Sequence, residues 1–292
     1  QLVGEDGGGR RLDHHAEFDA AGDAHLSGQS VEHDARRDDF GSINHHRQHD
    51  LDRAERLNGE DRAQLFDEQG LPRHLLGQPV AEARSMGIHE SQSLFCEMQL
   101  GHHPAFLSLI APRIRAHFGA EDALAPANLE KLYNRVEPGF IRVDADEVTY
   151  PAHVILRYEL ERDLIEGRIE VADIPALWDA KMQQWLGLST KGNYQNGCMQ
   201  DIHWTDGSFG YFPSYTLGAM YAAQLRFALE RELGDMGTLV ESGRLPEIFG
   251  WLGRHIWSQG SLHGTDELIR RATGEALNPQ WLRKHLEQRY LK

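Results

Sequence analysis

The hydrophobic pattern of the chain changes near residue 65. In residues 1–64, large apolar side chains follow neither a 3.6-residue nor a 2-residue period. From Leu65 onward, apolar positions recur at spacings of three and four residues, which is typical of amphipathic helices. We therefore expect residues 1–64 to be disordered or poorly packed, because they cannot bury enough apolar surface to offset their ordering entropy. Residues 65–292 should form a mainly α-helical body, folded as one packed unit.

Start and stop residues delimit several helices of this body. A capping residue followed by proline is a start signal, and a glycine after the last periodic position is a stop signal. These signals predict helices over 173–187 and 214–233, and a last helix that opens at Asn278-Pro279. Strand signals are few, and the best of them covers 140–143.

The stretch 77–101 carries acidic residues on an apolar stripe. On a helix, one face would hold Ala83, Met86, Glu90, Leu94 and Glu97. A carboxylate that faces a core is costly unless it is paired or binds a cation. The pattern therefore leaves two alternatives for Glu90, a salt-bridged or groove-lining acid and a metal ligand.

The stretch 150–167 predicts a helix with one mixed stripe. Its first half is polar, with Tyr150, His153 and Arg157, and its second half is apolar. This pattern fits a helix whose N-terminal end lines a cleft. The alternative is that Arg157 is buried against one of the many acidic residues.

The stretch 200–218 is rich in aromatic residues and leads into a helix. An Asp206-Gly207 turn signal lies in its middle. It could be the wall of a substrate site or simply a packed loop. Its aromatic side chains are His203, Trp204, Phe209, Tyr211, Phe212 and Tyr215.

Composition and charge exclude several classes of protein. The 292 residues carry a net charge of −15, which argues against a general nucleic-acid binder because such a protein needs clustered lysine and arginine. No run of 18 apolar residues exists, so we expect no transmembrane helix. The first 15 residues have no apolar stretch typical of a signal peptide. Two cysteines rule out a disulfide scaffold, so a reducing cytoplasm fits best.

Residues 1–64 have an unusual composition. They contain 23 charged residues and seven of the 17 histidines, but no Pro, Trp, Tyr, Lys, Met or Cys. Such a tract can be a solvated tail or a metal-binding segment, although no fixed scaffold would hold its ligands. The histidines concerned are His14, His15, His45, His46 and His49.

Several motifs, in order, make the body similar to the M32 family of metallocarboxypeptidases, the carboxypeptidase Taq type. They are EQGLP at 68–72, the stretch 77–101, IRVDADEVTYPAHVILRYELERDLIEG at 141–167, DIHWTDGSFGYFPSYTLGAMYAAQL at 201–225 and the G-x-x-L-x-P-x-W-L pattern at 274–282. The resemblance covers the body from residue 65 on. It implies a helical zincin with a deep groove, of which this body is the C-terminal half.

The resemblance also implies a chemistry. The family uses a zinc or cobalt ion to activate water and remove C-terminal residues from peptides. Two ligands are the histidines of H-E-x-x-H, whose glutamate is the general base. The third ligand is the glutamate of His-Glu-Ser-Gln-Ser, here Glu90, while Glu97 would be a supporting acid. A cytoplasmic homodimer that binds peptides with a free C-terminus, and neither nucleic acid nor membrane, is implied as well.

The sequence departs from the family at the metal site. H-E-x-x-H should stand at about residues 60–64, where this chain reads EDRAQ, and it occurs nowhere else. His89-Glu90 does not replace it, because Ser93 follows four residues after His89. One explanation is an incorrect reading frame upstream of residue 65, since plausible codons for His-Glu-Thr-Gly-His, read one base out, encode Arg-Asp-Arg-Ala. The other is a natural tail on a degenerate paralogue.

The motifs offer residues for peptide binding. Arginine recognises a carboxylate best, through a bidentate fork. We assign Arg142 to the C-terminal carboxylate of the substrate and give Arg157 a structural role, with Glu161 at i+4 as an available partner. His153 belongs with these two arginines at the substrate site.

The aromatic stretch would supply groups for catalysis. His203, Tyr211 and Tyr215 would hydrogen-bond the scissile carbonyl as its oxygen gains charge. Two other classes of protein stay open beside the enzyme. They are a catalytically dead fragment or peptide-binding pseudoenzyme, and an unrelated helical interaction module.

Limited proteolysis of the purified chain tests the division at residue 65. We expect residues 1–64 to be removed first, because a segment that buries little apolar surface exposes its backbone to the protease. Mass spectrometry should then find a resistant helical core. A tail that resists digestion as well as the core does would contradict both the expected disorder and the out-of-frame explanation.

Overall fold

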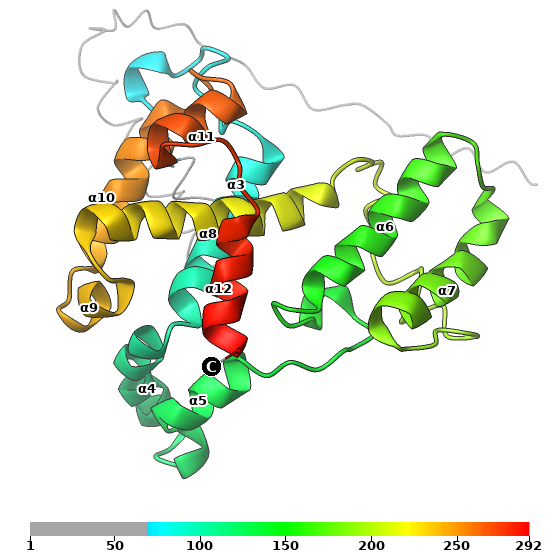
Figure 1. Ribbon diagram of the computed structural model, residues 1–292, viewed down its shortest axis with the longest axis horizontal. Helices are drawn as coiled ribbons and strands as arrows, with labels where there is room; N and C mark the ends of the chain where they lie inside the picture. Colours follow the sequence, from blue (N-terminus) through cyan, green and yellow to red (C-terminus); the bar gives the residue numbers. More distant parts are fainter. Residues whose placement is uncertain (1–68, 292) are drawn as a thin grey trace, which may run out of the picture. The chain divides into compact units, whose positions relative to one another are not determined.

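The computed structural model describes residues 69–291 (Figure 1). By its internal contacts the chain divides into two units, 1–49 and 50–292, and all described residues belong to the second. The segment expected over 1–64, with its histidines, lies outside the described residues. The helical elements are η1 (Arg73–Leu75), α3 (Met86–Leu94), η2 (Phe95–Gly101), α4 (Pro104–Phe118), η3 (Asp122–Leu124), α5 (Pro126–Tyr133), η4 (Arg142–Asp144), α6 (Tyr150–Ile165), η5 (Val171–Asp173), α7 (Ile174–Leu186), α8 (Pro213–Leu233), α9 (Met236–Glu241), α10 (Leu245–His255), η6 (Trp257–Gln259), α11 (Thr265–Thr273) and α12 (Gln280–Tyr290).

The expected mainly α-helical fold is confirmed, and residues 69–291 contain no strand. The strand predicted over 140–143 is therefore wrong. Arg142–Asp144 is a short 3-10 helix, η4, closed by the bond from the Asp144 amide to the Ile141 carbonyl. The backbone N–H of Arg142 donates to the side chain of Gln200 at 2.8 Å. A side chain thus satisfies the donor that a neighbouring strand would otherwise have bound.

The helices predicted from start and stop residues are confirmed. Helix α7 ends at Gly187, whose φ of 70° is the left-handed conformation that glycine adopts without strain. Helix α8 ends at Gly234. Before α12, the side chain of Asn278 accepts a hydrogen bond from the Gln280 amide at 3.1 Å.

The stretch 77–101 differs from the expected continuous helix. Helix α3 begins only at Met86, and η2 after it is a π-helix, in which i→i+5 bonds replace i→i+4 bonds. The predicted stripe is therefore broken. Glu90 and Leu94 are buried, whereas Met86 and Glu97 are exposed.

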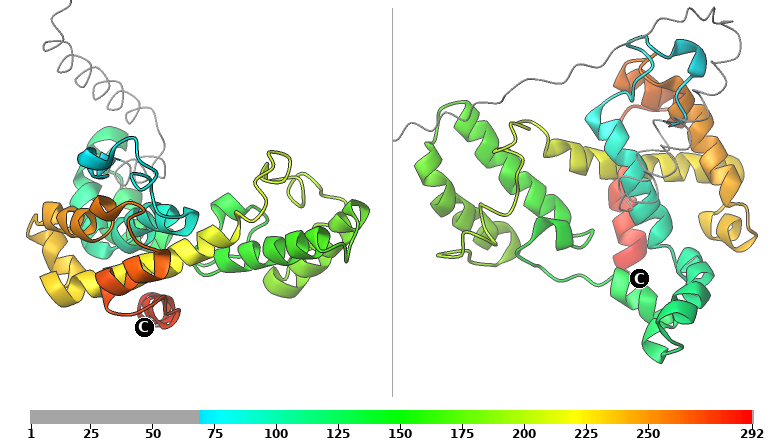
Figure 2. Two further views of the ribbon diagram at one scale, coloured as in Figure 1. Left: turned by 90° about the horizontal axis from the view of Figure 1, so that it is seen from above. Right: turned by 180° about the vertical axis from the view of Figure 1, so that it is seen from behind.

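Helix α8 lies at the centre of the largest core cluster. Its residues Ala222, Ala223 and Leu225 are completely buried. They belong to one apolar cluster with residues of α3, α10, α11 and α12. Figure 2 shows that α3 and α12 pack on opposite sides of α8. A second cluster joins α6 and α7 around Trp178 and Leu160.

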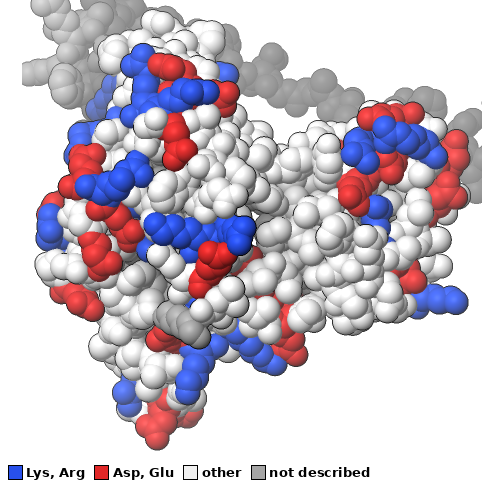
Figure 3. Space-filling view, viewed as in Figure 1, with Lys and Arg blue, Asp and Glu red and all other residues white. Residues whose placement is uncertain are grey.

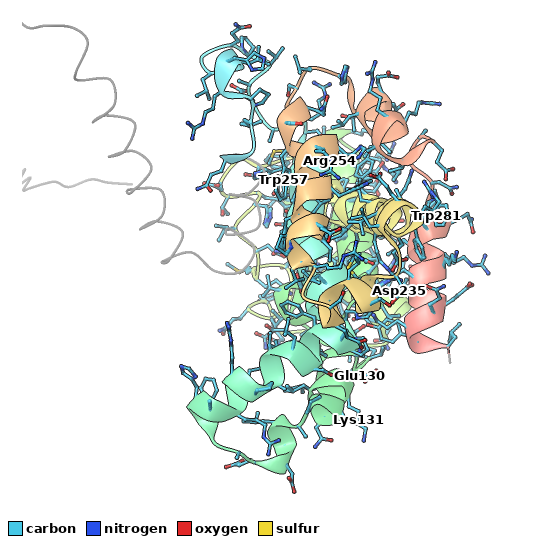
Figure 4. The ribbon with its side chains drawn as sticks, turned by 90° about the vertical axis from the view of Figure 1, so that its left-hand side faces the viewer. Glu130, Lys131, Asp235, Arg254, Trp257 and Trp281 are labelled. Atoms are coloured by element: carbon cyan, nitrogen blue, oxygen red, sulfur yellow. The ribbon has the colours of Figure 1, made fainter. Side chains whose placement is uncertain are left out.

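Helix α3 is held on two sides. Trp257 of η6 (Figure 4) donates from its indole nitrogen to the side chain of Gln92 at 2.8 Å. On the α8 side, a Cβ atom added at Gly218 would lie 3.0 Å from both Cβ and Cγ of Glu90. This distance is shorter than ordinary packing allows, so glycine at position 218 sets how closely Glu90 approaches α8.

Gly218→Ala should destabilise the fold, although alanine favours a helix over glycine by about 1 kcal/mol. The added methyl group must displace Glu90, and overpacking of this kind costs about 1–3 kcal/mol. Gly250→Ala in α10 is the matched control, because the nearest atom to its new methyl is the flexible Nη1 of Arg254 at 3.5 Å (Figure 4). Urea unfolding should show a loss for Gly218→Ala and none for Gly250→Ala. Equal free energies of unfolding in the two variants would contradict the packing argument.

Candidate functional site

One carboxylate joins two arginines from separate elements. Nε and Nη2 of Arg142, in η4, each lie 3.0 Å from Oδ1 of Asp201. Nε and Nη2 of Arg157, in α6, each lie 2.6 Å from Oδ2 of the same carboxylate. Asp201 comes from the irregular segment before α8. The segment of Asp201 is therefore tied to two elements that lie 44 and 59 residues before it.

Arg157 is entirely internal. Its side chain is 0% exposed, its Nη1 donates to the carbonyl of His153 at 2.8 Å, and its guanidinium lies 4.5 Å from the ring centroid of Trp178. The expected pairing with Glu161 is wrong. The carboxylate of Glu161 accepts instead from the indole of Trp204 at 2.7 Å and from a backbone amide. Arg157 finds its acid 44 residues away in sequence, at Asp201.

Arg142 has the same acid but also reaches a cavity of about 100 Å³. Its Nη1 donates to the hydroxyl of Tyr150 at 2.9 Å, and its guanidinium lies 4.6 Å from the ring centroid of Tyr215. A guanidinium has five N–H donors, and contacts with Tyr150 and Asp201 engage three. The two others lie one on each terminal nitrogen. Paired N–H groups on one guanidinium can bind a carboxylate in bidentate fashion.

Burial and the arginines set the protonation states around Asp201. Burial opposes ionisation of Asp201, but Arg157 and Arg142 outweigh it and hold the pKa of that carboxyl below its usual range. Burial, together with Arg157 and Arg142, lowers the pKa of His153 to about 4. His153 is therefore neutral at pH 7. Its side chain is completely buried and lies outside the lining of the cavity.

The three residues expected to act in catalysis lie together. Nε2 of His203 is 3.1 Å from the hydroxyl of Tyr215, and the rings of Tyr211 and Tyr215 are 5.2 Å apart. Burial, and then Arg142, lowers the pKa of His203, so this ring is neutral at pH 7. Of the three, Tyr215 lines the cavity beside Arg142. The aromatic segment is thus both a packed loop and one wall of the site.

Glu90 lies close to this cluster but outside the cavity lining. It is 3% exposed. Burial chiefly, with smaller effects of Tyr215 and Glu90, raises the pKa of Tyr150. Glu97 is exposed and lines the cavity.

The described residues do not fit a catalytic metal centre. Residues 69–291 contain no group of three or more His, Cys, Asp or Glu side chains arranged to hold a metal ion. A catalytic zinc needs three protein ligands and an open position for water. Glu90 would supply one of them, and the chain has no H-E-x-x-H motif to supply the histidines.

Sequence reasoning missed Asp201 and Tyr150 as site residues. Asp201 lies 44 and 59 residues from its two arginines, so no helical or strand spacing links them. The available signal was the first of two acids in the aromatic stretch, Asp201 and Asp206, in a chain with two arginines to be buried. Tyr150 was predicted to lie on the polar half of the helix stripe. Its hydroxyl group accepts a hydrogen bond from Arg142, which the sequence pattern did not indicate.

The fold and these motifs define a peptidase family. The family model described as Carboxypeptidase Taq (M32) metallopeptidase matches residues 65–290. The chain therefore belongs to the M32 family of metallocarboxypeptidases, and the resemblance drawn from the motifs is confirmed.

Relatives of known name and structure agree. The chain is 38% identical over 224 residues to Carboxypeptidase 1 of Bacillus subtilis, and 40% identical over 223 residues to Thermostable carboxypeptidase 1 of Thermus thermophilus. Each match covers 76% of this chain and 44% of the relative. The solved structure of Trypanosoma cruzi metallocarboxypeptidase 1 has a TM-score of 0.77 and 48% identity, covering 80% of this chain and 49% of that one. The chain thus spans about half the length of these relatives.

The distribution of surface charge and the character of the helices bear on the expected partners. Figure 3 shows basic side chains interspersed with acidic ones over the described surface on this face, instead of gathered into one basic area. Within residues 69–291, no helix combines the length and apolar character needed to cross a membrane.

Proposed function

We propose that this chain is the C-terminal, substrate-binding half of a metal-dependent carboxypeptidase that acts on peptides with a free C-terminus. The main support for this proposal comes from Arg142. Its side chain lines a cavity and has two N–H donors beyond those bonded to Asp201 and Tyr150. Family membership and the names of the relatives support the same class of activity. The zinc or cobalt ion, the homodimer and the cytoplasmic location implied by the resemblance belong to this proposal.

The residues of this half would divide the work of binding. Arg142 takes the C-terminal carboxylate of the peptide, while Asp201 and Tyr150 fix the plane of its guanidinium. His203 and Tyr215, already hydrogen-bonded to each other, would donate to the carbonyl of the last peptide bond. A donor aimed at that oxygen matters most as the oxygen gains charge. Arg157 holds Asp201 in place from inside the protein.

A second candidate is a peptide-binding pseudoenzyme or inactive fragment. The absence of H-E-x-x-H from the sequence and of a metal-binding group among residues 69–291 favours it for this chain as it stands. Both candidates bind the peptide in the same way and differ in the metal. We therefore assign no hydrolytic step to the residues present.

Metal analysis separates the two candidates. With Glu90 as the sole family ligand in the sequence, the purified chain should carry far less than one zinc ion per molecule after dialysis, because a single carboxylate cannot hold zinc. Plasma mass spectrometry measures the ratio. A stoichiometric ion that is lost in Glu90→Ala would show a complete metal site and exclude the pseudoenzyme.

A pair of peptides that differ only in C-terminal amidation tests the role of Arg142. The chain should bind the free acid more tightly, and Arg142→Ala should remove most of that preference, since a charge-assisted bond contributes about 1.5–3 kcal/mol, or roughly tenfold and more. Calorimetry measures both affinities. Arg162→Ala is the control, because it removes an equally charged side chain from α6 that is 42% exposed.

The result that would reverse the assignment is equally definite. Retained discrimination in Arg142→Ala, with discrimination lost in Arg157→Lys, would show that the two arginines have been assigned the wrong way round. Circular dichroism should accompany the second variant, because Arg157 is buried.

A further inference from the structure

Glu147 is a buried carboxylate that the proposed binding scheme does not use. It follows Arg142 by five residues, and its side chain is 2% exposed. All three of its hydrogen-bond donors come from α12. They are Nε2 of His285 at 2.5 Å, Nη1 of Arg289 at 2.8 Å and the hydroxyl of Tyr290 at 3.0 Å.

The contacts fix both the charge and the tautomer of this cluster. Burial opposes ionisation of Glu147, but His285 and Arg289 outweigh it and hold the pKa of the carboxyl below its usual range. Nη1 of Arg226 lies 3.2 Å from Nδ1 of His285. Because arginine can only donate, Nδ1 is the acceptor, and Nε2 carries the proton given to Glu147. A buried carboxylate with this many donors holds its position strongly.

The segment from Arg142 to Glu147 is short and internally bonded. The Ala145 amide donates to the Arg142 carbonyl at 3.1 Å, at the end of η4. The carboxylate of Asp146 accepts from the amide and hydroxyl of Thr149, at 3.0 and 2.8 Å, where α6 begins. These bonds leave a short, internally bonded backbone segment between Arg142 and Glu147, along which a shift of Glu147 would be passed. Both residues line the same cavity.

We propose that Glu147 is a positioning residue for Arg142, and that α12 holds it in place. Asp201 fixes the guanidinium of Arg142 from one side, and the bonds from α12 to Glu147 fix its backbone from the other. This inference rests on the proposed function in one respect, the binding of a peptide carboxylate by Arg142. Glu147 would act through the backbone of this segment and through no contact of its own with the peptide carboxylate.

Glu147→Gln tests the proposal on the full chain. The amide keeps the shape of the side chain but loses its charge, so the donors of α12 hold it less well. Calorimetry with the free-acid and amidated peptides should show a loss of about five- to tenfold for the free acid, equivalent to about 1 kcal/mol, and no change for the amide. Tyr290→Phe, which removes one donor of three, should give a smaller loss of the same kind.

Glu137→Gln is the matched control, because it makes the same charge change on a side chain that is 61% exposed near this segment. It should leave both affinities unchanged. An equal loss for the two peptides in Glu147→Gln would reduce Glu147 to a general stabilising residue and overturn the proposal. So would an unchanged preference for the free acid in both Glu147→Gln and Tyr290→Phe.

Hydrogen exchange distinguishes failure of this proposal from failure of the proposed function. If the wild-type chain shows no preference for the free acid, the binding role of Arg142 is wrong, and exchange alone decides on Glu147. Amides of residues 142–149 should then exchange about tenfold faster in Glu147→Gln, with no change in α10 (Leu245–His255). Equal protection of residues 142–149 in the two proteins would overturn the positioning role.

Discussion

The site depends on one carboxylate shared by two guanidinium groups. Asp201 comes from an irregular segment, Arg142 from a one-turn helix and Arg157 from the middle of α6. None of the three is more than slightly exposed, so each charge needs the others. Apolar packing has little directional preference, whereas these short contacts fix both distance and orientation. The irregular segment before α8 therefore has a defined place without regular secondary structure.

The helical body keeps this cluster beside the residues of α3 and α8. Helix α8 has Tyr215 in its first turn and Gly218 one turn later, where Glu90 of α3 packs against it. The same helix that supplies an aromatic wall to the cavity therefore sets the position of Glu90. On the opposite face of α8, α12 packs and also reaches Glu147. The core and the cavity are thus built on the same few helices.

Local sequence signals predicted the helices well and the site only in part. Glycine at 187 and 234 and asparagine at 278 act within one turn, so the bounds of α7, α8 and α12 followed from them. Arg142 came from a resemblance to known motifs, not from its spacing. Asp201 could not be found by period, because its partners lie 44 and 59 residues away. The strand expected over 140–143 failed because a side chain, not a neighbouring strand, satisfies its backbone.

The π-helix after Leu94 changes the direction in which the later side chains of this segment point. Each wide turn takes in one more residue than an α-turn, so the inward direction is rotated relative to a helical wheel drawn from Met86. Gln99 consequently points into the protein and Glu97 toward the cavity. Removing a single residue between 95 and 101 would turn the side chains after the deletion by about 100° relative to those before it. In this segment, the number of residues therefore determines the structure as much as the identity of any side chain does.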